Sequence, residues 1–372
     1  MPALAVAAAL EARGADVTFI GARGASASGR VAAAGYVEDQ IPLRGLDRRL
    51  SLRNVRTVVM TVLAVPRVVR ALRRRGADVV IGAGGYVAGP VALAAWLTRR
   101  PVLLMEADSH MGVANRMAAP LARRVTLAFP LPGRTGRRYL VTGRPVAKDV
   151  VDATRTAGRR AFGIDPDATV VLVVGGSQGA RTLNVAAVEA FGDDPPVDII
   201  HVAGPGQVDE ARAMLDARTP GPRYRLLGWL DNLPDAIAAA DLVVSRSGGS
   251  VFELAAIGRP SILVPYPHAT GDHQAKNARW LSEAGGAVVL PDADCTGERL
   301  RALVGALLAD RRRLDAMADA AAAVGRPDAA DRVADAALAL VRPRRARRLR
   351  RIPRPRLPKL RRPRRRATGP ER

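Results

Sequence analysis

The chain has 372 residues, more than one compact core usually holds, and this length predicts two domains. Hydrophobic residues make up 48% of it, yet no run approaches the ~20 apolar residues that a transmembrane helix needs. One cysteine, Cys295, excludes a disulfide framework, and the start (residues 2–14, PALAVAAALEARG) lacks the basic region of a secretory signal, so a reducing cytoplasm is favoured.

The net charge of +23 is concentrated at the C-terminal end. Residues 342–372 hold fifteen arginines and one lysine against one glutamate, a net charge of +15, which leaves +8 for the rest of the chain. Prolines interrupt these arginines, so the segment is predicted to be a disordered polycation. Such a tail attracts anionic lipid and nucleic acid without sequence specificity, or it is merely a solvated tail.

Helix-like and strand-like segments alternate along the first part of the chain, which is typical of parallel sheets built from βαβ units. Helices are expected at Ala3–Arg13, Pro90–Leu97 and Asn115–Ala122, and strands at Asp16–Ile20, Val79–Ile81, Pro101–Met105 and Val125–Phe129. This part opens with a helix, whereas a doubly wound domain normally opens with a strand and a glycine-rich turn.

The segment Leu50–Arg75 interleaves Val, Leu and Met with arginines and is predicted to form a pair of helices broken at Pro66. One face of these helices is expected to pack in the core. The alternative is that the apolar residues between the arginines dock on an anionic membrane surface.

A loop rich in Pro, Gly and Arg (residues 130–138) leads to a domain boundary near residues 145–165, and a second βα series follows it. Its strands are expected at Val171–Val174, Val197–Val202, Tyr224–Leu227, Asp241–Val244 and Ser261–Val264. We therefore expect α/β domains at residues 1–147 and 148–341 and a tail at 342–372. Two open α/β domains place a ligand cleft between them, at the carboxyl ends of their strands.

The most informative segment is VLVVGGSQGAR (residues 171–181), in which a buried strand turns through glycines into a helix start. Free backbone N–H groups and the positive end of the helix dipole make such a turn a ready site for a phosphate or diphosphate. A tight turn without a ligand uses the same residue types. The expected ligand contacts are Gly176, Ser177 and Gln178.

The same arrangement recurs at DLVVSRSGGSVFE (residues 241–253). Glu253 falls in the first turn of the following helix, where a carboxylate interacts favourably with the helix dipole. It could instead accept hydrogen bonds from the two hydroxyls of a ribose. Two such loops in one domain favour a nucleotide diphosphate as the ligand.

Polar residues also follow the next strand, in ILVPYPHATGDHQAKN (residues 262–277). Asp272 is a good N-cap for a helix, and the amides of Gln274 and Asn277 suit the recognition of sugar hydroxyls. No carboxylate or cysteine joins His268 and His273 in a recognisable metal pattern, so a metal is not expected there.

Two Asp-x-Asp pairs match a pattern that holds a divalent metal in some sugar-nucleotide enzymes. The first lies in a linker beside a proline, and the second follows a strand-like segment. Exposed loop aspartates are the better interpretation of both pairs, Asp165/Asp167 and Asp292/Asp294.

The chain resembles the lipid II-forming N-acetylglucosaminyltransferases of glycosyltransferase family 28, the MurG type, over roughly residues 1–340. Four motifs in order carry the resemblance: GGYVAGP (84–90), GGSQGARTLN (175–184), SRSGG…FELAAIGRP (245–260) and PYPHATGDHQAKNARWL (265–281). It implies the GT-B fold, two Rossmann-like domains with parallel sheets facing across a cleft, of which the first serves the acceptor and membrane side and the second the UDP-sugar.

The same resemblance implies a reaction. N-acetylglucosamine would move from UDP-N-acetylglucosamine to the undecaprenyl-diphosphate-linked muramoyl-pentapeptide, at the cytoplasmic face of the cell membrane. The chemistry is expected to be an inverting, metal-independent displacement without a cofactor. The expected partners are the UDP-sugar donor, the polyprenyl-diphosphate lipid acceptor and an anionic membrane surface, with nucleic acid only through the basic tail.

Carried over motif by motif, the resemblance places Ser177 at the donor diphosphate or its sugar, Leu230 against the uracil and Glu253 at the ribose. Gln274, with Asn277 nearby, would hold the hydroxyls of N-acetylglucosamine. The acceptor side would be bordered by Gly84, Gly85 and Tyr86. The nucleotide would be lined by Arg246, Ser247, Gly248, Gly249, Ser250 and Val251.

The sequence departs from the family pattern in four places. The resemblance implies that the family's first strand and its glycine-rich loop are missing here, together with the histidine implied as general base. We interpret this as a gene model that starts at an internal codon. Glu106-Ala107-Asp108 replaces Glu-Gln-Asn, which makes Asp108 a candidate substrate contact and Asp108 or His110 the candidate base. Arg144-Pro145-Val146-Ala147 replaces Asn-Pro-Val-Arg, so Arg144 or Lys148 would have to substitute for a donor-side arginine. The segment from Arg246 to Glu253 is one residue shorter than usual.

Two other functions stay open at this point. A paralogous UDP-sugar glycosyltransferase would act on another lipid or on a small-molecule acceptor. The missing loop and the polycationic tail also fit a non-catalytic membrane- or RNA-binding protein, which donor binding would argue against.

Overall fold

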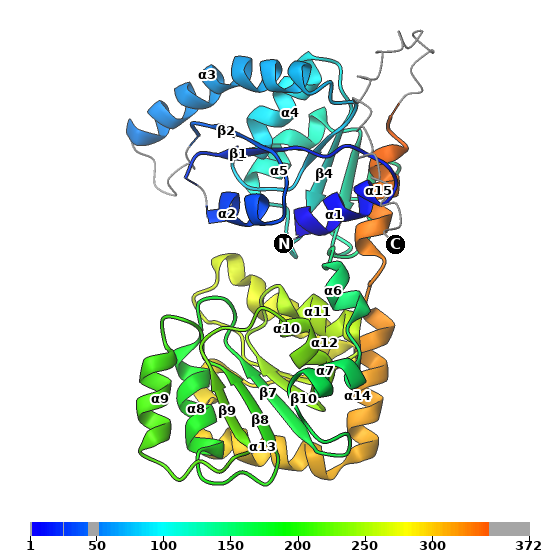
Figure 1. The fold of residues 1–372 in the computed structure, drawn as a ribbon. Coiled ribbons are helices and arrows are strands. Elements are labelled where there is room, and N and C mark those ends of the chain that lie inside the picture. The colour runs from blue at the N-terminus through cyan, green and yellow to red at the C-terminus, as the bar shows by residue number, and fades with distance from the viewer. Residues whose placement is uncertain (1, 25, 44–51, 342–372) are drawn as a thin grey trace, which may run out of the picture. The chain divides into compact units, whose positions relative to one another are not determined.

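The computed structural model describes residues 2–24, 26–43 and 52–341, and the predicted disordered tail lies outside them. Within the described residues, helices cover parallel sheets in two successive arrangements (Figure 1). The α/β class expected from the alternating pattern is confirmed.

The first arrangement contains a sheet with the strand order β3-β4-β5-β6, in which every neighbouring pair is parallel. Its strands are β3 (Val80–Gly82), β4 (Val102–Glu106), β5 (Arg124–Leu127) and β6 (Tyr139–Val141). A parallel pair, β1 (Phe19–Ala22) and β2 (Glu38–Ile41), precedes it, so the strand expected at Asp16–Ile20 begins later. The helices here are α1 (Pro2–Glu11), α2 (Ser26–Ala33), α3 (Leu52–Arg74), α4 (Ala88–Leu97), α5 (Val113–Ala118) and the 3-10 turn η1 (Ala119–Leu121).

Helix α3 corrects one prediction, because Pro66 lies inside a continuous helix instead of breaking it. Proline removes one N–H donor and leaves the carbonyl of Val62, one turn earlier, without its helical partner. Both residues are exposed, so water can satisfy that carbonyl. On the opposite face, Ala64, Val68 and Leu72 are buried in a cluster with residues of β3 and α4, so the expected core face of α3 exists.

The second arrangement is built on a parallel sheet with the strand order β12-β11-β10-β7-β8-β9. The chain enters at β7, builds β8 and β9 on one side, and then returns to build β10 to β12 on the other. The order therefore reverses between β7 and β10, the position at which open α/β sheets bind ligands. The strands are β7 (Val170–Val174), β8 (Asp198–Val202), β9 (Tyr224–Leu227), β10 (Leu242–Ser245), β11 (Ser261–Leu263) and β12 (Ala287–Val289).

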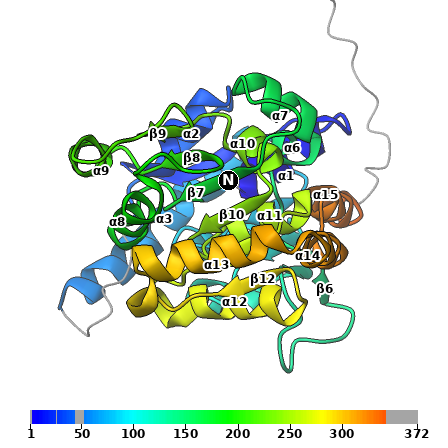
Figure 2. The same cartoon turned by 90° about the horizontal axis from the view of Figure 1, so that it is seen from below.

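Helices cover both faces of this sheet, with α8 and α13 on one side of the strands and α10 on the other (Figure 2). The uninterrupted apolar sequence of β7 follows from this burial. Val171 and Val173 pack toward α8 and α13, and Leu172 packs toward α10. The helices are α6 (Lys148–Asp152), α7 (Arg155–Ala161), α8 (Arg181–Phe191), α9 (Val208–Asp216), α10 (Leu233–Ala239), α11 (Ser250–Ile257), α12 (His273–Glu283), α13 (Gly297–Ala309), α14 (Arg311–Val324) and α15 (Ala329–Leu338), with 3-10 turns η2 (Thr270–Asp272) and η3 (Asp292–Asp294).

Helix α15, orange in Figure 1, packs beside α1, which is blue. Val333 is buried in one cluster with Leu10 of α1 and Leu103 of β4. Arg13 pairs with Asp331 and Asp335 at 2.7 Å each across the same contact. The last helix thus contributes to the core of the first arrangement, and the boundary after residue 147 stays a prediction.

The described residues contain no helix with both the length and the apolar character needed to span a bilayer.

Candidate functional site

The loop between β7 and α8 (residues 175–180) lies at the reversal of strand order. Gly176 and Gly179 have φ angles of 86° and 75°, a left-handed backbone conformation that favours glycine. Ser177 and Gln178 are exposed, and no described residue accepts a hydrogen bond from their backbone N–H groups. The turn therefore presents unpaired donors at the start of α8, which is the geometry of an anion site.

Substitution of Gly179 tests whether the turn has room for a side chain at this position. A Cβ at this position would overlap the carbonyl oxygen of Ala203, in addition to the strain of a positive φ. We expect Gly179→Ala to lower the free energy of unfolding by ~1–3 kcal/mol. Gly206→Ala is the matched control, because a Cβ there meets no atom within 4 Å. Urea unfolding of both variants checks this, and equal stability would contradict the account of the turn.

The side-chain amides of Asn184 and Gln207 link the turn between β7 and α8 to the residues after β8. Asn184 of α8 donates from Nδ2 to Ala203 O (3.0 Å) and to Gln207 Oε1 (2.9 Å). Gln207 in turn donates from Nε2 to the backbone oxygen of Gln178 (3.3 Å). The carbonyl of Gln178 is thereby occupied by the protein.

A buried histidine completes this network. Because both Nδ2 hydrogens of Asn184 are used, its Oδ1 accepts from His201 Nε2 (3.0 Å), which assigns the proton of a neutral ring to Nε2. The free Nδ1 then accepts from the Tyr224 hydroxyl (2.8 Å). Burial lowers the pKa of His201 to about 4, so the ring is neutral near pH 7.

The loop between β10 and α11 repeats the strand–loop–helix arrangement at the neighbouring strand, although Gly249 has an ordinary φ of −65°. Ser245 of β10 pairs with Val174 of β7, so the two loops leave the same edge of the sheet side by side. No described residue accepts a hydrogen bond from the backbone N–H groups of Gly248 and Gly249. The two loops together offer unpaired donors to one anionic group or to two linked ones.

Glu253 lies half-buried in the first turn of α11, four residues after Gly249. Burial raises the pKa of its carboxyl above the usual value, and the positive charge of Arg144 opposes that shift. The Arg144 guanidinium lies 5.4 Å from the ring centroid of Phe252. Its Nη2 is 3.1 Å from the place of a Cβ at Gly249, so a cation stands beside the loop.

Lys148 and Arg144, the two candidates to replace a donor-side arginine, have different surroundings in the structure. Lys148 is exposed and pairs with Asp152 of its own helix. Arg144 donates from Nη1 to Ala107 O (2.9 Å) and Asp108 Oδ1 (3.2 Å). Of these two, Arg144 is therefore the cation that lies beside the glycine-rich loop.

Several expected ligand contacts are used by the protein itself. Asn277 is buried and donates from Nδ2 to Ser247 O (3.1 Å), so it supports the loop in this structure. Gln274 accepts from the backbone N–H of Tyr266 through Oε1 (3.0 Å). Val251 is fully buried, whereas Leu230 is only partly buried against the core.

Arg246 is also engaged by protein groups. Its side chain is only 10% exposed and forms an ion pair with Asp292, the first residue of the second Asp-x-Asp pair. The sequence pattern did not reveal this pairing, because the two residues lie 46 positions apart.

On the first arrangement, Glu106 and Asn115 form a buried pair that was not predicted from the sequence. Glu106 Oε2 accepts from Asn115 Nδ2 and from Gly112 N, both at 2.9 Å. These bonds shape the loop of residues 107–112, which carries Asp108 and His110. A carboxylate at the end of the apolar strand β4 was the available signal.

The remaining first-arrangement candidates lie in loops after β3 and β4. Gly84 and Gly85 have φ angles of 87° and 70°, and Tyr86 is exposed. His110 Nδ1 is buried and has no hydrogen-bond partner among the described residues. His110 Cε1 is 3.4 Å from the place of a Cβ at Gly271.

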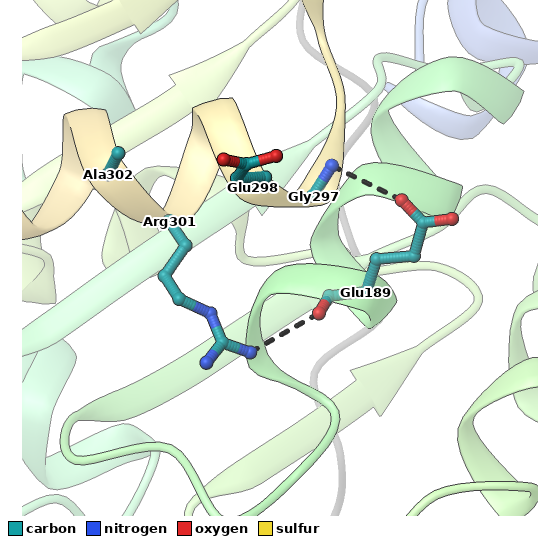
Figure 3. A pocket seen from close by; sticks show the side chains of 5 residues that line it. All are labelled: Glu189, Gly297, Glu298, Arg301 and Ala302. Atoms are coloured by element: carbon teal, nitrogen blue, oxygen red, sulfur yellow. Dashed lines mark hydrogen bonds between the residues drawn. The ribbon is translucent and has the colours of Figure 1, made fainter.

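A crevice of about 460 Å³ between α8 and α13 lies away from these loops (Figure 3). Glu189, near the end of α8, accepts from Gly297 N (3.2 Å), and its backbone oxygen accepts from Arg301 (3.3 Å). The crevice is lined by the carboxylates of Glu189 and Glu298, whose negative charge would repel a diphosphate. This crevice is therefore not the candidate site.

No three His, Cys, Asp or Glu side chains of the described ranges converge in a way that could hold a metal ion. Asp165 Oδ1 accepts from the backbone N–H of Asp167 (2.8 Å), which is a local turn. The first Asp-x-Asp pair thus has a structural use.

Comparisons with known proteins agree with this geometry. Residues 1–127 match the N-terminal domain of glycosyltransferase family 28, and residues 170–333 match its C-terminal domain. The chain is 41% identical over 348 residues to the UDP-N-acetylglucosamine–N-acetylmuramyl-(pentapeptide) pyrophosphoryl-undecaprenol N-acetylglucosamine transferase of Moorella thermoacetica, covering 89% of this chain and 93% of that protein. The Desulforudis audaxviator transferase of the same name is 39% identical over 350 residues, 90% of this chain and 93% of its own length.

Among solved structures, MurG of Acinetobacter baumannii superposes with a TM-score of 0.71 at 28% identity, covering 91% of this chain and 95% of that one. This likeness confirms the expected GT-B fold. Together with the identity to the transferases over nine-tenths of the sequence, it establishes that the chain belongs to the MurG-type transferases of glycosyltransferase family 28.

Proposed function

We propose that this chain transfers N-acetylglucosamine from UDP-N-acetylglucosamine to N-acetylmuramyl-pentapeptide carried on pyrophosphoryl-undecaprenol. The carrying observation is the pair of glycine-rich loops with unpaired N–H groups at the strand-order reversal, in a chain 39–41% identical to transferases of that name. A UDP-sugar has the linked phosphates that such a pair of loops would bind.

The donor would lie along the second sheet. In this proposal the N–H groups of Gly176, Ser177 and Gln178 face one phosphate, and those of Gly248 and Gly249 face the other. Glu253 accepts hydrogen bonds from the ribose hydroxyls. Leu230 lies against the uracil, and Gln274 holds the sugar hydroxyls.

The reaction is a single displacement at the anomeric carbon. The acceptor hydroxyl oxygen forms the new bond, and the bond from carbon to the β-phosphate oxygen breaks as UDP leaves with its electron pair. The fixed N–H groups and Arg144 would stabilise the charge that develops on UDP. The hydroxyl proton passes to a base, for which Asp108 and His110 are the candidates because both lie on the loop after β4.

Donor recognition can be tested by calorimetry before any transfer is measured. The purified chain is expected to bind UDP-N-acetylglucosamine and UDP more tightly than UMP, since UMP lacks the second phosphate. A weaker response to UDP-glucose would assign part of the affinity to the N-acetyl group. Equal binding of UMP and UDP would contradict the two-loop phosphate site.

We further propose that the acceptor reaches the site from a membrane surface to which the chain binds peripherally. Helix α4 packs against both α3 and α5, and exposed apolar side chains lie on these helices, among them Met117 (72% exposed) and Trp96 (55%). Exposed arginines accompany them, including Arg99 and Arg116. Apolar side chains flanked by arginines favour an anionic lipid interface.

A double variant tests this surface. Trp96→Ser with Met117→Ser is expected to lower binding to vesicles containing anionic lipid at least about tenfold, because two large apolar side chains no longer enter the interface. Val289→Ser on β12 is the control, since that side chain is also exposed (39%) but lies in the second arrangement. Co-sedimentation with vesicles measures the difference, and equal binding of double variant and control would refute the assignment.

A further inference from the structure

We propose that Asp292 is a positioning residue that ties the two glycine-rich loops together through Arg246 and Thr182. This inference rests on the proposed function, because it concerns the same donor site. It gives a role to the second Asp-x-Asp pair.

The contacts of Asp292 join three elements. It is the first residue of the turn η3, which follows β12 after two residues, and its Oδ1 accepts from Nη1 of Arg246, the residue that follows β10. Its Oδ2 accepts from the hydroxyl of Thr182 (3.4 Å), in the first turn of α8. One carboxylate thus contacts the start of the loop between β10 and α11, at Arg246, and the first turn of the helix that follows the loop between β7 and α8, at Thr182.

Arg246 is held on its other sides as well. Nη1 also donates to Val264 O (3.2 Å), and the guanidinium lies 5.5 Å from the ring centroid of Tyr266. The backbone oxygen of Arg246 accepts from Ser250 Oγ (3.2 Å) at the start of α11. Arg246 is therefore hydrogen-bonded both to Val264, which follows β11, and to Ser250, the first residue of the helix after the Gly248-Gly249 amides.

Removing the carboxylate would leave a largely buried guanidinium without its counter-charge. Such a cation must recruit water or shift toward solvent, since an unpaired buried charge is strongly unfavourable. A shift of the guanidinium would displace the loop between β10 and α11, and a recruited water would hold it less firmly than the carboxylate does. A metal ion at Asp292 would have to displace Arg246, which distinguishes the positioning role from a metal-binding one.

Calorimetric titration with UDP tests the inference on the full chain. Asp292→Asn preserves the shape of the side chain and is expected to raise the Kd about tenfold, the loss expected from one charge-assisted hydrogen bond. Asp292→Glu retains the charge and is expected to restore part of the affinity. Asp294→Asn is the matched control, because Asp294 lies two residues away and is exposed, so its Kd should stay within about twofold.

The binding stoichiometry separates positioning from folding. A purely structural role would lower the fraction of competent sites and leave the Kd of the remaining sites unchanged, and that result would overturn the proposal. Equal effects of Asp292→Asn and Asp294→Asn, with UDP binding that requires Mg²⁺ or Mn²⁺, would instead support a metal site and also overturn it. Failure of the unaltered chain to bind UDP would refute the proposed function itself.

Discussion

Replacing Glu253 by alanine is expected to lower kcat/KM for UDP-N-acetylglucosamine by about 100-fold, because two hydrogen bonds to a charged acceptor are worth roughly 1.5–3 kcal/mol each and part of that is recovered by water. Glu253→Gln keeps one oxygen acceptor without the charge and should lie between alanine and wild type. Steady-state kinetics with varied donor concentration measure both effects, which should appear mainly in KM.

The burial of Glu253 makes this result separable from a folding defect. Burial raises the pKa of the Glu253 carboxyl, so the charged form is disfavoured in the folded protein and Glu253→Gln should not lower the thermal midpoint. Donor affinity should also weaken on acidification at a higher pH than for an ordinary glutamate. Glu298→Ala is the control, because Glu298 likewise lies in the first turn of a helix, α13, but away from the loops. Equal kinetics of Glu253→Ala and Glu298→Ala would exclude a donor contact at Glu253.

The largest expected stability effect belongs to His201. Its pKa is about 4 in the folded chain and roughly 6.5 in the unfolded chain, so the unfolded state binds the extra proton between these values. The contribution of His201 is fully present above pH ~6.5 and is lost as the pH falls toward 4. The pKa difference corresponds to about 3 kcal/mol of unfolding free energy.

Urea unfolding at pH 7.5 and pH 5 of the wild type and His201→Gln measures this contribution. Glutamine retains a donor and an acceptor but does not titrate, so the variant should lose less stability between the two pH values. His268→Gln serves as the control at an exposed position, where the substitution should change the free energy of unfolding by less than about 0.5 kcal/mol. An unchanged pH dependence in His201→Gln would contradict the assigned network.

The strands and their loops were predictable because their signals are local. A continuous apolar run at Val171–Val174 indicates a strand buried on both faces, and the glycines after it indicate a tight turn into a helix. Both features appear in the structure, and so does the repeat of that pattern at β10 and α11. The short elements β6, α6 and α7 were not predicted: they have three, five and seven residues, too few to show a period.

Side-chain partners were less predictable, because they depend on residues far apart in the sequence. Arg246 was expected to line the nucleotide, yet its guanidinium is paired with Asp292. Asn277 was expected near the sugar, yet its amide nitrogen holds Ser247. Both pairings arise because parallel strands end side by side at one edge of the sheet, and a local sequence pattern does not indicate which residues meet there.

We propose that this chain glycosylates a lipid-linked muramyl acceptor. The most direct measurement incubates the purified full chain with UDP-N-acetylglucosamine and pyrophosphoryl-undecaprenol N-acetylmuramyl-pentapeptide in vesicles, and follows UDP and the lipid product by mass spectrometry. We expect one UDP released for each lipid that gains one N-acetylglucosamine, with no product when the acceptor is omitted. Tight binding of UDP-N-acetylglucosamine without any glycosylated lipid would contradict the claim.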